Sequence, residues 1–426
     1  MSIFEYEKPP RTMEETGLTH SFLTDLTSKI MYEGGTMTPS SVSEVIRLPN
    51  IVCRQIILEM VSLGLIEAQG LETEDIKSEI RYTLTDAGRR RALQAMMVSR
   101  YIGPAPVTFE SFCRQVKTQS IVNEEVRRDT LERALGHLVI PSGMMDQLGP
   151  AANSARSVLL YGEPGNGKTS IAEALKDTFQ DTLFVPYAFI VGNQLIRFFD
   201  ETLHERVDLP ANAEKPDPRW VPCRRPVITS GGELTLDMLD LAFEMTSRFY
   251  EAPMHLKALG GVFVIDDFGR QVAKPQQFLN RWILPLEKGY DILSLHTGKK
   301  FKVPFDQLVV FSSNLRPEEL GDGAALRRIY FKIHVPSPTR EDYFKIFSAA
   351  CEAQDIKFER GVVEAFYQRE YEQAGVVTSG AHPNFLLHHV KAICRYHDKR
   401  MELTDDLLRI SWKNVVKYKK NDAVDA

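Results

Sequence analysis

One short motif constrains the fold of this chain more than any other feature. The segment Gly162-Glu-Pro-Gly-Asn-Gly-Lys-Thr169 matches the pattern G-x-x-x-x-G-K-[ST] at every fixed position. The apolar run 158–161 precedes it, and apolar residues at helical spacing follow it. In such a strand–loop–helix unit the glycines let successive backbone N–H groups turn toward one point, and the helix N-terminus adds partial positive charge. The motif therefore predicts a phosphate-binding loop for a nucleoside triphosphate.

The loop assigns a role to its side chains as well. The residues expected to surround the phosphates are Gly162, Glu163, Pro164, Gly165, Asn166, Gly167, Lys168, Thr169 and Ser170. The Lys168 ammonium is expected to contact the β- and γ-phosphates, and the Thr169 hydroxyl is expected to bind Mg²⁺. A glycine-rich turn without chemistry is the alternative, and the flanking strand and helix patterns count against it.

Two acids end a second apolar run, Gly261-Val-Phe-Val-Ile-Asp-Asp267. Continuous apolar runs are typical of central parallel strands, whose ligands lie at the carboxyl ends. Asp266 is placed to hold Mg²⁺ through water, and Asp267 is placed to orient the attacking water as a general base. Helix capping is the alternative for such a pair, since Asp favours N-caps. The phosphate loop upstream favours the catalytic interpretation.

Polar and cationic residues follow two further strand patterns. The run Leu308-Val-Val-Phe311 ends in Ser312-Ser313-Asn314, so the Asn314 amide is a candidate to position the same water. Arg327 and Arg328 precede the alternating strand pattern of 329–335. They are either a solvated helix end or a guanidinium donated to the γ-phosphate of a neighbouring subunit.

Composition limits the classes of protein that this chain can represent. Apolar residues make up 43% and charged residues 26%, as in ordinary globular proteins. The net charge of −5 gives no global attraction for nucleic acid, so any such binding must be local. No apolar run approaches the roughly 20 residues of a membrane span, and the first residues lack a secretion-signal pattern. The five scattered cysteines indicate reduced thiols, so we expect a cytoplasmic protein without a membrane partner.

Breaks in the pattern divide the chain. We expect a flexible arm over residues 1–13, a first domain over 14–100, a linker and helical connector over 101–135, a nucleotide-binding α/β domain over 136–336, and a helical domain with a frayed tail over 337–426. The linker begins with Tyr101-Ile-Gly-Pro-Ala-Pro106, which is stiff because proline and the residue before it avoid helix. The helical domain is expected to break at 378–380 and 382–383.

The first domain has a predicted order of three helices, a strand, an acid-rich loop (72–79), a strand and a last helix. This order, and Tyr82-Thr-Leu-Thr-Asp-Ala-Gly88 in particular, resembles winged-helix domains. DNA binding is the obvious expectation for them, but residues 14–100 hold 9 Lys and Arg against 12 Asp and Glu. Useful DNA affinity needs several cations near the phosphates. We therefore favour docking of a protein, with DNA binding through Arg89, Arg90, Arg91 and Arg100 as the alternative.

Taken in order, the motifs of residues 136–420 resemble those of AAA+ ATPases: Walker A, Walker B, sensor 1, arginine finger and helical lid. The resemblance implies ATP and Mg²⁺ as ligands, an α/β domain with a small α-helical lid, and a ring of identical subunits, expected as a hexamer. It implies Lys168 and Thr169 as nucleotide and Mg²⁺ ligands and Asp266 as the Mg²⁺ carboxylate. It further implies Asn314 as sensor 1 and Arg327 or Arg328 as the finger. Val139 and Ile140 match the family's segment that covers the adenine.

This sequence departs from the family's pattern at two places. The second Walker B acid is usually Glu in this family, whereas here it is Asp267, whose side chain is one methylene shorter. Displacing a catalytic group by an ångström can lower the rate on the order of 10²-fold. The lid segment 379–385 has no sensor 2 arginine; Asn384, or else His382, stands in its place. Neither supplies a permanent positive charge.

Two insertions have functional and structural interpretations. The segment 201–232 is too long for an ordinary connector, and its Trp220 either grips a substrate in a ring pore or, as we favour, pins a loop. The segment 293–304 is expected to form a hairpin with its turn at Thr297-Gly298. Its three lysines either touch a polymer's phosphates or form a solvated tip.

The sequence thus predicts an AAA+ ATPase that couples Mg²⁺–ATP hydrolysis to the remodelling of a protein partner or of a substrate held by an adaptor. The winged helix is its expected docking module. A DNA-binding ATPase that uses the winged helix on duplex DNA is the first alternative. A non-hydrolysing ATP-dependent switch or scaffold is the second, because of Asp267 and the missing arginine.

Overall fold

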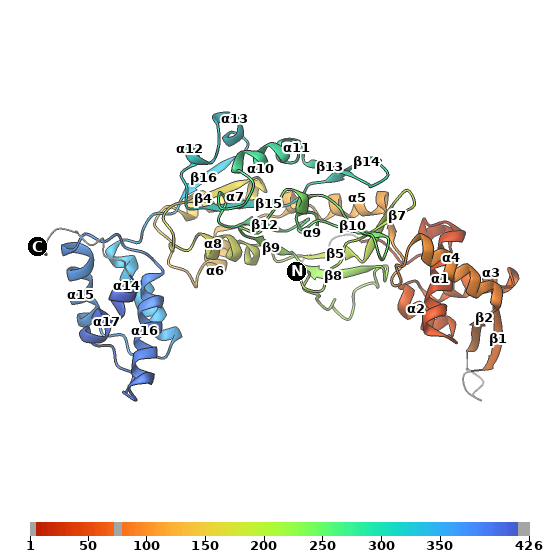
Figure 1. Cartoon of the computed structure of the whole chain (residues 1–426), viewed down its shortest axis with the longest axis horizontal. Helices are drawn as coiled ribbons and strands as arrows, with labels where there is room; N and C mark the ends of the chain where they lie inside the picture. Colours follow the sequence, from red (N-terminus) through yellow and green to blue (C-terminus); the bar gives the residue numbers. More distant parts are fainter. Residues whose placement is uncertain (1–5, 72–78, 416–426) are drawn as a thin grey trace, which may run out of the picture. The chain divides into compact units, whose positions relative to one another are not determined.

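The computed structural model describes residues 6–71 and 79–415 (Figure 1). The chain forms two compact units. The first consists of Met1–Glu125, Phe179–Phe263 and Gln277–Leu308, and the second consists of Val126–Thr178, Val264–Gln276 and Val309–Ala426. Each unit is assembled from three separate stretches of the chain, and the expected boundaries at 135/136 and 336/337 stay predictions. The first residues of the expected arm, the acid-rich loop 72–78 and the tail 416–426 lie outside the described residues.

The N-terminal module, residues 14–100, has the predicted order of elements. It contains α1 (His20–Gly34), α2 (Pro39–Ile46), α3 (Asn50–Ser62), β1 (Ile66–Leu71), β2 (Ile80–Leu84) and α4 (Asp86–Val98). The Thr85 hydroxyl caps α4 by accepting a hydrogen bond from the Gly88 N–H. A glycine is required there, since a Cβ on Gly88 would lie 2.0 Å from the Leu65 carbonyl oxygen.

The beginnings of α2 and α3 meet at the Glu79 carboxylate. It accepts hydrogen bonds from the Ser40 N–H at 3.0 Å, the Asn50 side-chain amide at 3.3 Å and the Arg54 guanidinium at 2.9 Å. Burial raises the pKa of Glu79, but the hydrogen bonds from Ser40 and Arg54 outweigh it and lower the pKa to about 2. The single cation of α3 is therefore paired within the module.

The exposed surface of α3 is mostly apolar. Ile51 is 56% exposed, Leu58 66% and Val61 43%. With Arg54 already paired to Glu79, this face presents little positive charge to a phosphate backbone.

The first unit also contains a five-stranded sheet that was not predicted. Its order is β10 (Ala242–Glu244), β11 (Phe249–Glu251), β7 (Gln194–Arg197), β6 (Ala188–Val191) and β3 (Val107–Thr108). Helix α5 (Phe109–Thr118) packs here through Phe112, whose ring stacks on Phe189 at a centroid distance of 4.4 Å. Part of the expected arm is anchored in this unit, because Glu7 accepts hydrogen bonds from Ser111 and Arg114.

The two insertions are ordered. Strand β5 (Thr182–Pro186) pairs antiparallel with β8 (Trp220–Arg224), and Trp220 is only 4% exposed. Trp220 is therefore a packing residue, and its burial argues against a gripping role. The expected hairpin is formed by β13 (Tyr290–Ser294) and β14 (Lys300–Pro304), and Lys299, Lys300 and Lys302 are exposed.

A second five-stranded sheet carries the motifs. Its order is β16 (Phe331–His334), β4 (Val158–Tyr161), β15 (Leu308–Ser313), β12 (Val262–Ile265) and β9 (Val227–Ser230). β15 and β16 both run parallel to β4, and β4, β12 and β15 are almost entirely buried, as their continuous apolar runs predict. The carboxyl ends of β4, β12 and β15 lead directly into the three polar motifs.

The α-helices between residues 128 and 326 are short. They are α6 (Arg128–Ala134), α7 (Met145–Ser154), α8 (Lys168–Ala174), α9 (Met254–Lys257), α10 (Pro275–Arg281), α11 (Ile283–Lys288), α12 (Pro317–Leu320) and α13 (Gly323–Leu326). In the part of the chain that the structure describes, no helix is both long and apolar enough to cross a bilayer.

The C-terminal helical segment, residues 339–415, is built around aromatic side chains. It contains α14 (Arg340–Ala353), α15 (Arg360–Tyr367), a π-helical turn (Gln368–Gln373), α16 (His382–Tyr396) and α17 (Asp405–Val415). Tyr343, Phe366 and Trp412 are at most 1% exposed, and the Phe366 and Trp412 rings meet edge to face at 5.2 Å. Helical structure is interrupted over residues 374–381, which includes the predicted position 378–380. The break predicted at 382–383 is wrong, because α16 begins at His382 and holds Pro383 in its first turn, where proline is tolerated.

Candidate functional site

The glycine-rich loop lies between β4 and α8, and its glycines are required by its geometry. Gly165 and Gly167 have φ angles of 80° and 81°, in the left-handed region that favours glycine. A Cβ on Gly162 would lie 2.2 Å from the Val335 carbonyl oxygen, and one on Gly165 would lie 2.5 Å from the Ser379 hydroxyl oxygen. The loop is thus a close-fitting backbone cradle at a helix N-terminus, which suits phosphate.

Lys168 is the buried cation of this cradle. Its side chain is 6% exposed and donates hydrogen bonds to the Gly162 and Glu163 carbonyl oxygens at 3.0 and 2.9 Å. It also donates to Asn314 Oδ1 at 2.8 Å. Burial lowers the pKa of Lys168, whereas Asp266 and Asp267 act in the opposite direction. The phosphate loop and the end of β15 are therefore joined through one ammonium group.

Thr169 and Asp266 form the second connection. The Thr169 hydroxyl oxygen lies 2.9 Å from each carboxylate oxygen of Asp266. Asp266 is held in place by the Asp267 N–H, which donates to Asp266 Oδ1 at 3.0 Å. Hydroxyl and carboxylate oxygens are ligands that Mg²⁺ prefers.

Asp267 and Asn314 form the third connection. The Asn314 side-chain amide donates to Asp267 Oδ1 at 3.1 Å while its oxygen accepts from Lys168. The strand ends that carry them are tied together, because the Phe268 N–H donates to the Ser312 carbonyl at 2.7 Å. Asp267 is exposed and has a φ of 47°, so a strained turn projects this acid from the end of β12.

Gln271 supports this turn and was not predicted from the sequence. Its side-chain amide donates to the Asp266 carbonyl at 3.1 Å, and its oxygen accepts from the Gly269 N–H at 2.9 Å. The side chain is 8% exposed. A single glutamine in a loop belongs to no recognisable sequence motif. Only the position of Gln271, five residues after Asp266, could therefore have suggested its role.

The two arginines are not brought to the phosphate loop. Both follow α13; Arg327 is exposed, and its guanidinium has no hydrogen-bond or ion-pair partner among residues 6–71 and 79–415. The Arg328 guanidinium donates to the carbonyl of Ala324 in the same helix, and the Arg328 carbonyl accepts a hydrogen bond from the Ser157 hydroxyl at 2.8 Å. Within this chain, Arg327 faces solvent and Arg328 is tied to its own helix.

The C-terminal helical segment reaches the phosphate loop through residues that the sequence did not single out. The Gly380 N–H donates to Asn166 Oδ1 at 3.2 Å, and the Ser379 hydroxyl donates to the Pro164 carbonyl at 3.4 Å. Asn166 also donates to the Ser337 hydroxyl at 3.4 Å. The sequence position expected for sensor 2 is thus close to the loop, but these contacts are made by residues that precede α16.

The remaining predicted residues lie apart from these contacts. Asn384 is exposed on the first turn of α16 and has no hydrogen bond to the phosphate loop in the described structure. His382 Nδ1 instead forms a hydrogen bond with the Tyr371 hydroxyl at 2.9 Å. Burial lowers the pKa of the His382 imidazole to about 4. Val139 and Ile140 lie between α6 and α7 and are half-buried. Ser170 is exposed in the first turn of α8.

The side chains present fit a magnesium–nucleotide ligand. No cluster of three or more His, Cys, Asp or Glu residues capable of holding a metal occurs within the described ranges. The protein would therefore supply Thr169 and Asp266, leaving the other ligands to phosphate and water, which is the usual arrangement for Mg²⁺. The backbone cradle and the buried Lys168 provide the complementary positive charge.

This site belongs to an α/β fold with a five-stranded sheet and C-terminal helices. Residues 339–414 match the family model described as "Domain of unknown function (DUF8689)". No match was found among the curated proteins.

Solved structures with distant similarity include the Thermotoga maritima RuvB Holliday junction branch migration motor. That structure is 13% identical, with 72% of this chain and 71% of that chain covered, and a TM-score of 0.35. Two point mutants of the same T. maritima protein are also 13% identical. For the first mutant, the match covers 70% of this chain and 72% of the mutant chain, with a TM-score of 0.36. For the second mutant, it covers 73% of this chain and 76% of the mutant chain, with a TM-score of 0.37. These values are too low to support a statement about function.

Proposed function

We propose that this protein is a Mg²⁺-dependent ATPase of the AAA+ type, which assembles into a ring and remodels a protein partner. One observation carries the proposal. Lys168 from the phosphate loop, Asn314 from the end of β15 and Asp267 from the end of β12 form a continuous hydrogen-bonded chain. Three segments far apart in sequence therefore supply the parts needed to bind a triphosphate and to position a water molecule beside it.

Each side chain has a role that follows from its contacts. Lys168 exchanges its carbonyl contacts for the β- and γ-phosphate oxygens of the substrate ATP. Thr169 and Asp266 would hold Mg²⁺, which would supply positive charge to neutralise the phosphates. Asp267 accepts a proton from the attacking water while Asn314 fixes the carboxylate and the water in position.

The ring is proposed because Lys168 is the one cation that the described contacts bring to the phosphate loop, while Arg327 is exposed and has no partner among the described residues. An arginine supplied by a neighbouring subunit would complete the site and would couple hydrolysis to assembly.

The N-terminal module is proposed to dock a protein. Glu79 neutralises Arg54 where α2 and α3 begin, and the exposed face of α3 carries Ile51, Leu58 and Val61. An apolar helix face suits a protein partner better than it suits duplex DNA, whose affinity depends on several cations near its phosphates.

The test of this function is nucleotide binding and hydrolysis by the full chain. Lys168→Ala should abolish ATP binding, and Asp267→Asn should keep binding but lower turnover at least about 10²-fold. Asp355→Asn is the matched control, because Asp355 is also an exposed aspartate with positive φ, at 57°, outside the site. Unchanged ATP affinity in Lys168→Ala would show that the loop is misinterpreted.

The Asp267→Asn variant also serves as a trap for the partner. Held in the ATP-bound state, it should retain a protein that the wild type releases after hydrolysis. Recovery of the same proteins with and without ATP would contradict ATP-dependent remodelling.

A further inference from the structure

The C-terminal helical segment separates its charges along the sequence. Residues 339–390 hold 5 Lys and Arg against 8 Asp and Glu, whereas residues 391–415 hold 6 against 4. The first part has a net charge of −3 and the second a net charge of +2, in a chain whose total is −5. Positive charge is thus concentrated in the last turns of α16, in α17 and in the segment between them.

The cations of the two parts differ in pairing. In the first part, Arg340, Lys345, Lys357 and Arg369 form ion pairs, and Arg360 is the exception among the described residues. In the second part, Arg400 approaches Glu402 at 3.6 Å. Five further cations of residues 391–415 have no ion pair or side-chain hydrogen bond within the described structure: Lys391, Arg395, Lys399, Arg409 and Lys413. Asp405 is already paired with Arg369, so the unpaired charges in this part remain predominantly positive.

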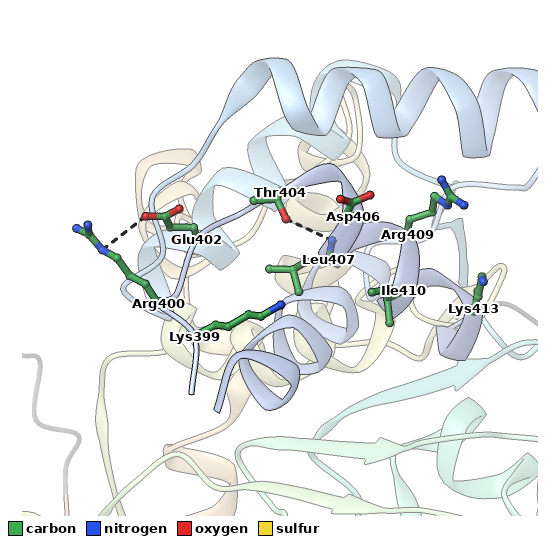
Figure 2. Close-up of a pocket in the computed structure, with 9 residues that line it drawn as sticks. All are labelled: Lys399, Arg400, Glu402, Thr404, Asp406, Leu407, Arg409, Ile410 and Lys413. Carbon is green, nitrogen blue, oxygen red and sulfur yellow. Dashed lines mark hydrogen bonds and ion pairs between the residues drawn. The ribbon is translucent and has the colours of Figure 1, made fainter. Parts of the chain in front are cut away.

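Three of these cations, Lys399, Arg409 and Lys413, line one hollow of about 650 Å³ together with Arg400. Figure 2 shows Lys399 and Arg400 on the segment before α17 and Arg409 and Lys413 on α17 itself. Leu407 and Ile410 lie between them, and Ile410 is 50% exposed. We call this feature the cationic hollow. Its four cations outnumber the two acids of its lining, Glu402 and Asp406, so its net positive rim and apolar middle suit a ligand that carries both phosphates and flat apolar groups.

An exposed aromatic residue stands close to the hollow in the sequence. Tyr396 ends α16, three residues before Lys399, and is 86% exposed. Its neighbour Arg395 is one of the unpaired cations. Exposed aromatic rings beside cations bind single strands, because bases stack on the rings while the cations track the phosphates.

We propose that the cationic hollow, with Tyr396, binds single-stranded nucleic acid. This is a binding activity additional to the proposed ATPase, and it does not depend on nucleotide. The contrast with the N-terminal module supports this location, because Glu79 pairs the only cation of α3, whereas Lys399, Arg409 and Lys413 of the hollow have no ion pair among the described residues.

The first experiment measures binding of a fluorescent 20-nucleotide oligothymidine to the full chain at several salt concentrations. A triple variant should bind oligothymidine about 100-fold more weakly than the wild type at 0.1 M salt. It combines Lys399→Gln, Arg409→Gln and Lys413→Gln. The slope of log K against log salt should become about 2 less steep, since each lost contact to a single strand contributes about 0.7. Basal ATP turnover should not change, which also shows that the variant folds.

The matched control removes three cations from the other part of the same segment, as Lys345→Gln, Lys357→Gln, Arg360→Gln. Its net charge equals that of the first variant, so a purely global charge effect would weaken both equally and would overturn the proposal. The double variant with Arg89→Gln and Arg90→Gln tests the N-terminal module. Its affinity for oligothymidine should stay within about twofold of the wild type. No binding of oligothymidine by the wild type at 50 mM salt would also overturn the proposal.

The second experiment separates stacking from charge. Tyr396→Ala should weaken oligothymidine binding about tenfold, whereas Tyr396→Phe should retain it, because phenylalanine keeps the stacking face. Equal loss in both variants would contradict stacking. Polyglutamate of similar charge should bind far more weakly than oligothymidine; equal affinity would instead identify the surface as a dock for acidic protein segments.

Discussion

Asp267 occupies a backbone conformation that suits a short acid. Its φ of 47° lies in the left-handed region, where Asp and Asn are enriched among residues other than glycine. The Asn314 amide meets its carboxylate at 3.1 Å, and Gln271 supports the turn behind it. The shorter acid is therefore matched to its surroundings, although the AAA+ pattern usually has Glu there.

We predict that Asp267→Glu lowers the turnover number by one to two orders of magnitude, because a displaced carboxylate no longer meets both Asn314 and the water. ATP affinity should change little, since Lys168 and Thr169 are untouched. The measurement is steady-state hydrolysis together with ATP binding.

Asp355→Glu is the control for this substitution. It makes the same change at another exposed aspartate with positive φ, so it reproduces the backbone strain without touching the site. Faster turnover by Asp267→Glu would mean that the missing methylene, rather than the turn, limits the rate.

The contact between the C-terminal helical segment and the phosphate loop depends on small residues. A Cβ on Gly380 would lie 3.1 Å from the Gly165 carbonyl oxygen, a backbone atom that cannot move independently of the loop. We predict that Gly380→Ala displaces the 379–381 turn and weakens ATP binding about tenfold, as expected for an overpacking cost of about 1.4 kcal/mol. Titration calorimetry with ATP would measure the change.

Gly361→Ala is the matched control for Gly380→Ala. Gly361 lies in α15, and a Cβ there would meet nothing within 4 Å. Alanine in a helix stabilises it by roughly 0.5–1 kcal/mol relative to glycine, so ATP affinity should be unchanged in this variant. Similar affinities for both variants and the wild type would show that the turn does not influence the loop.

The predictable elements are those with long, uniform patterns. The apolar runs of β4, β12 and β15 and the capped helix after Thr85 were predicted from sequence because burial on both faces and N-cap chemistry leave clear signals. The sheet from β10 to β3 was not predicted. Its strands have only 2 to 4 residues each, too few for a periodicity, and distant segments supply their neighbours.

The same reasoning applies to the candidate site. The positions of Lys168, Thr169, Asp266 and Asn314 could be predicted because parallel strands place their carboxyl ends along one edge. The roles of Ser379 and Gly380 could not, since a hydrogen bond from a turn to a loop about 215 residues away has no local signature.

At the scale of the whole molecule, the proposed ring makes a prediction about mixed assemblies. Arg327 is exposed and has no partner in the described part of its own chain, whereas Arg328 is tied to Ala324. If Arg327 acts on the ATP of a neighbouring subunit, Arg327→Ala should retain ATP binding and lose about 10³-fold in turnover. Arg328→Ala should have a smaller effect on turnover.

Mixing two inactive variants tests whether the arginine acts between subunits. Lys168→Ala subunits cannot hold ATP but still offer Arg327, and Arg327→Ala subunits hold ATP but lack the arginine. Mixed rings should therefore regain activity at the boundaries where an intact phosphate loop meets an intact arginine, and the gain should depend on the mixing ratio. Each variant alone serves as the baseline. Absence of any gain, when light scattering shows that mixed rings have formed, would place Arg327 outside the reaction and leave hydrolysis to the residues of a single chain.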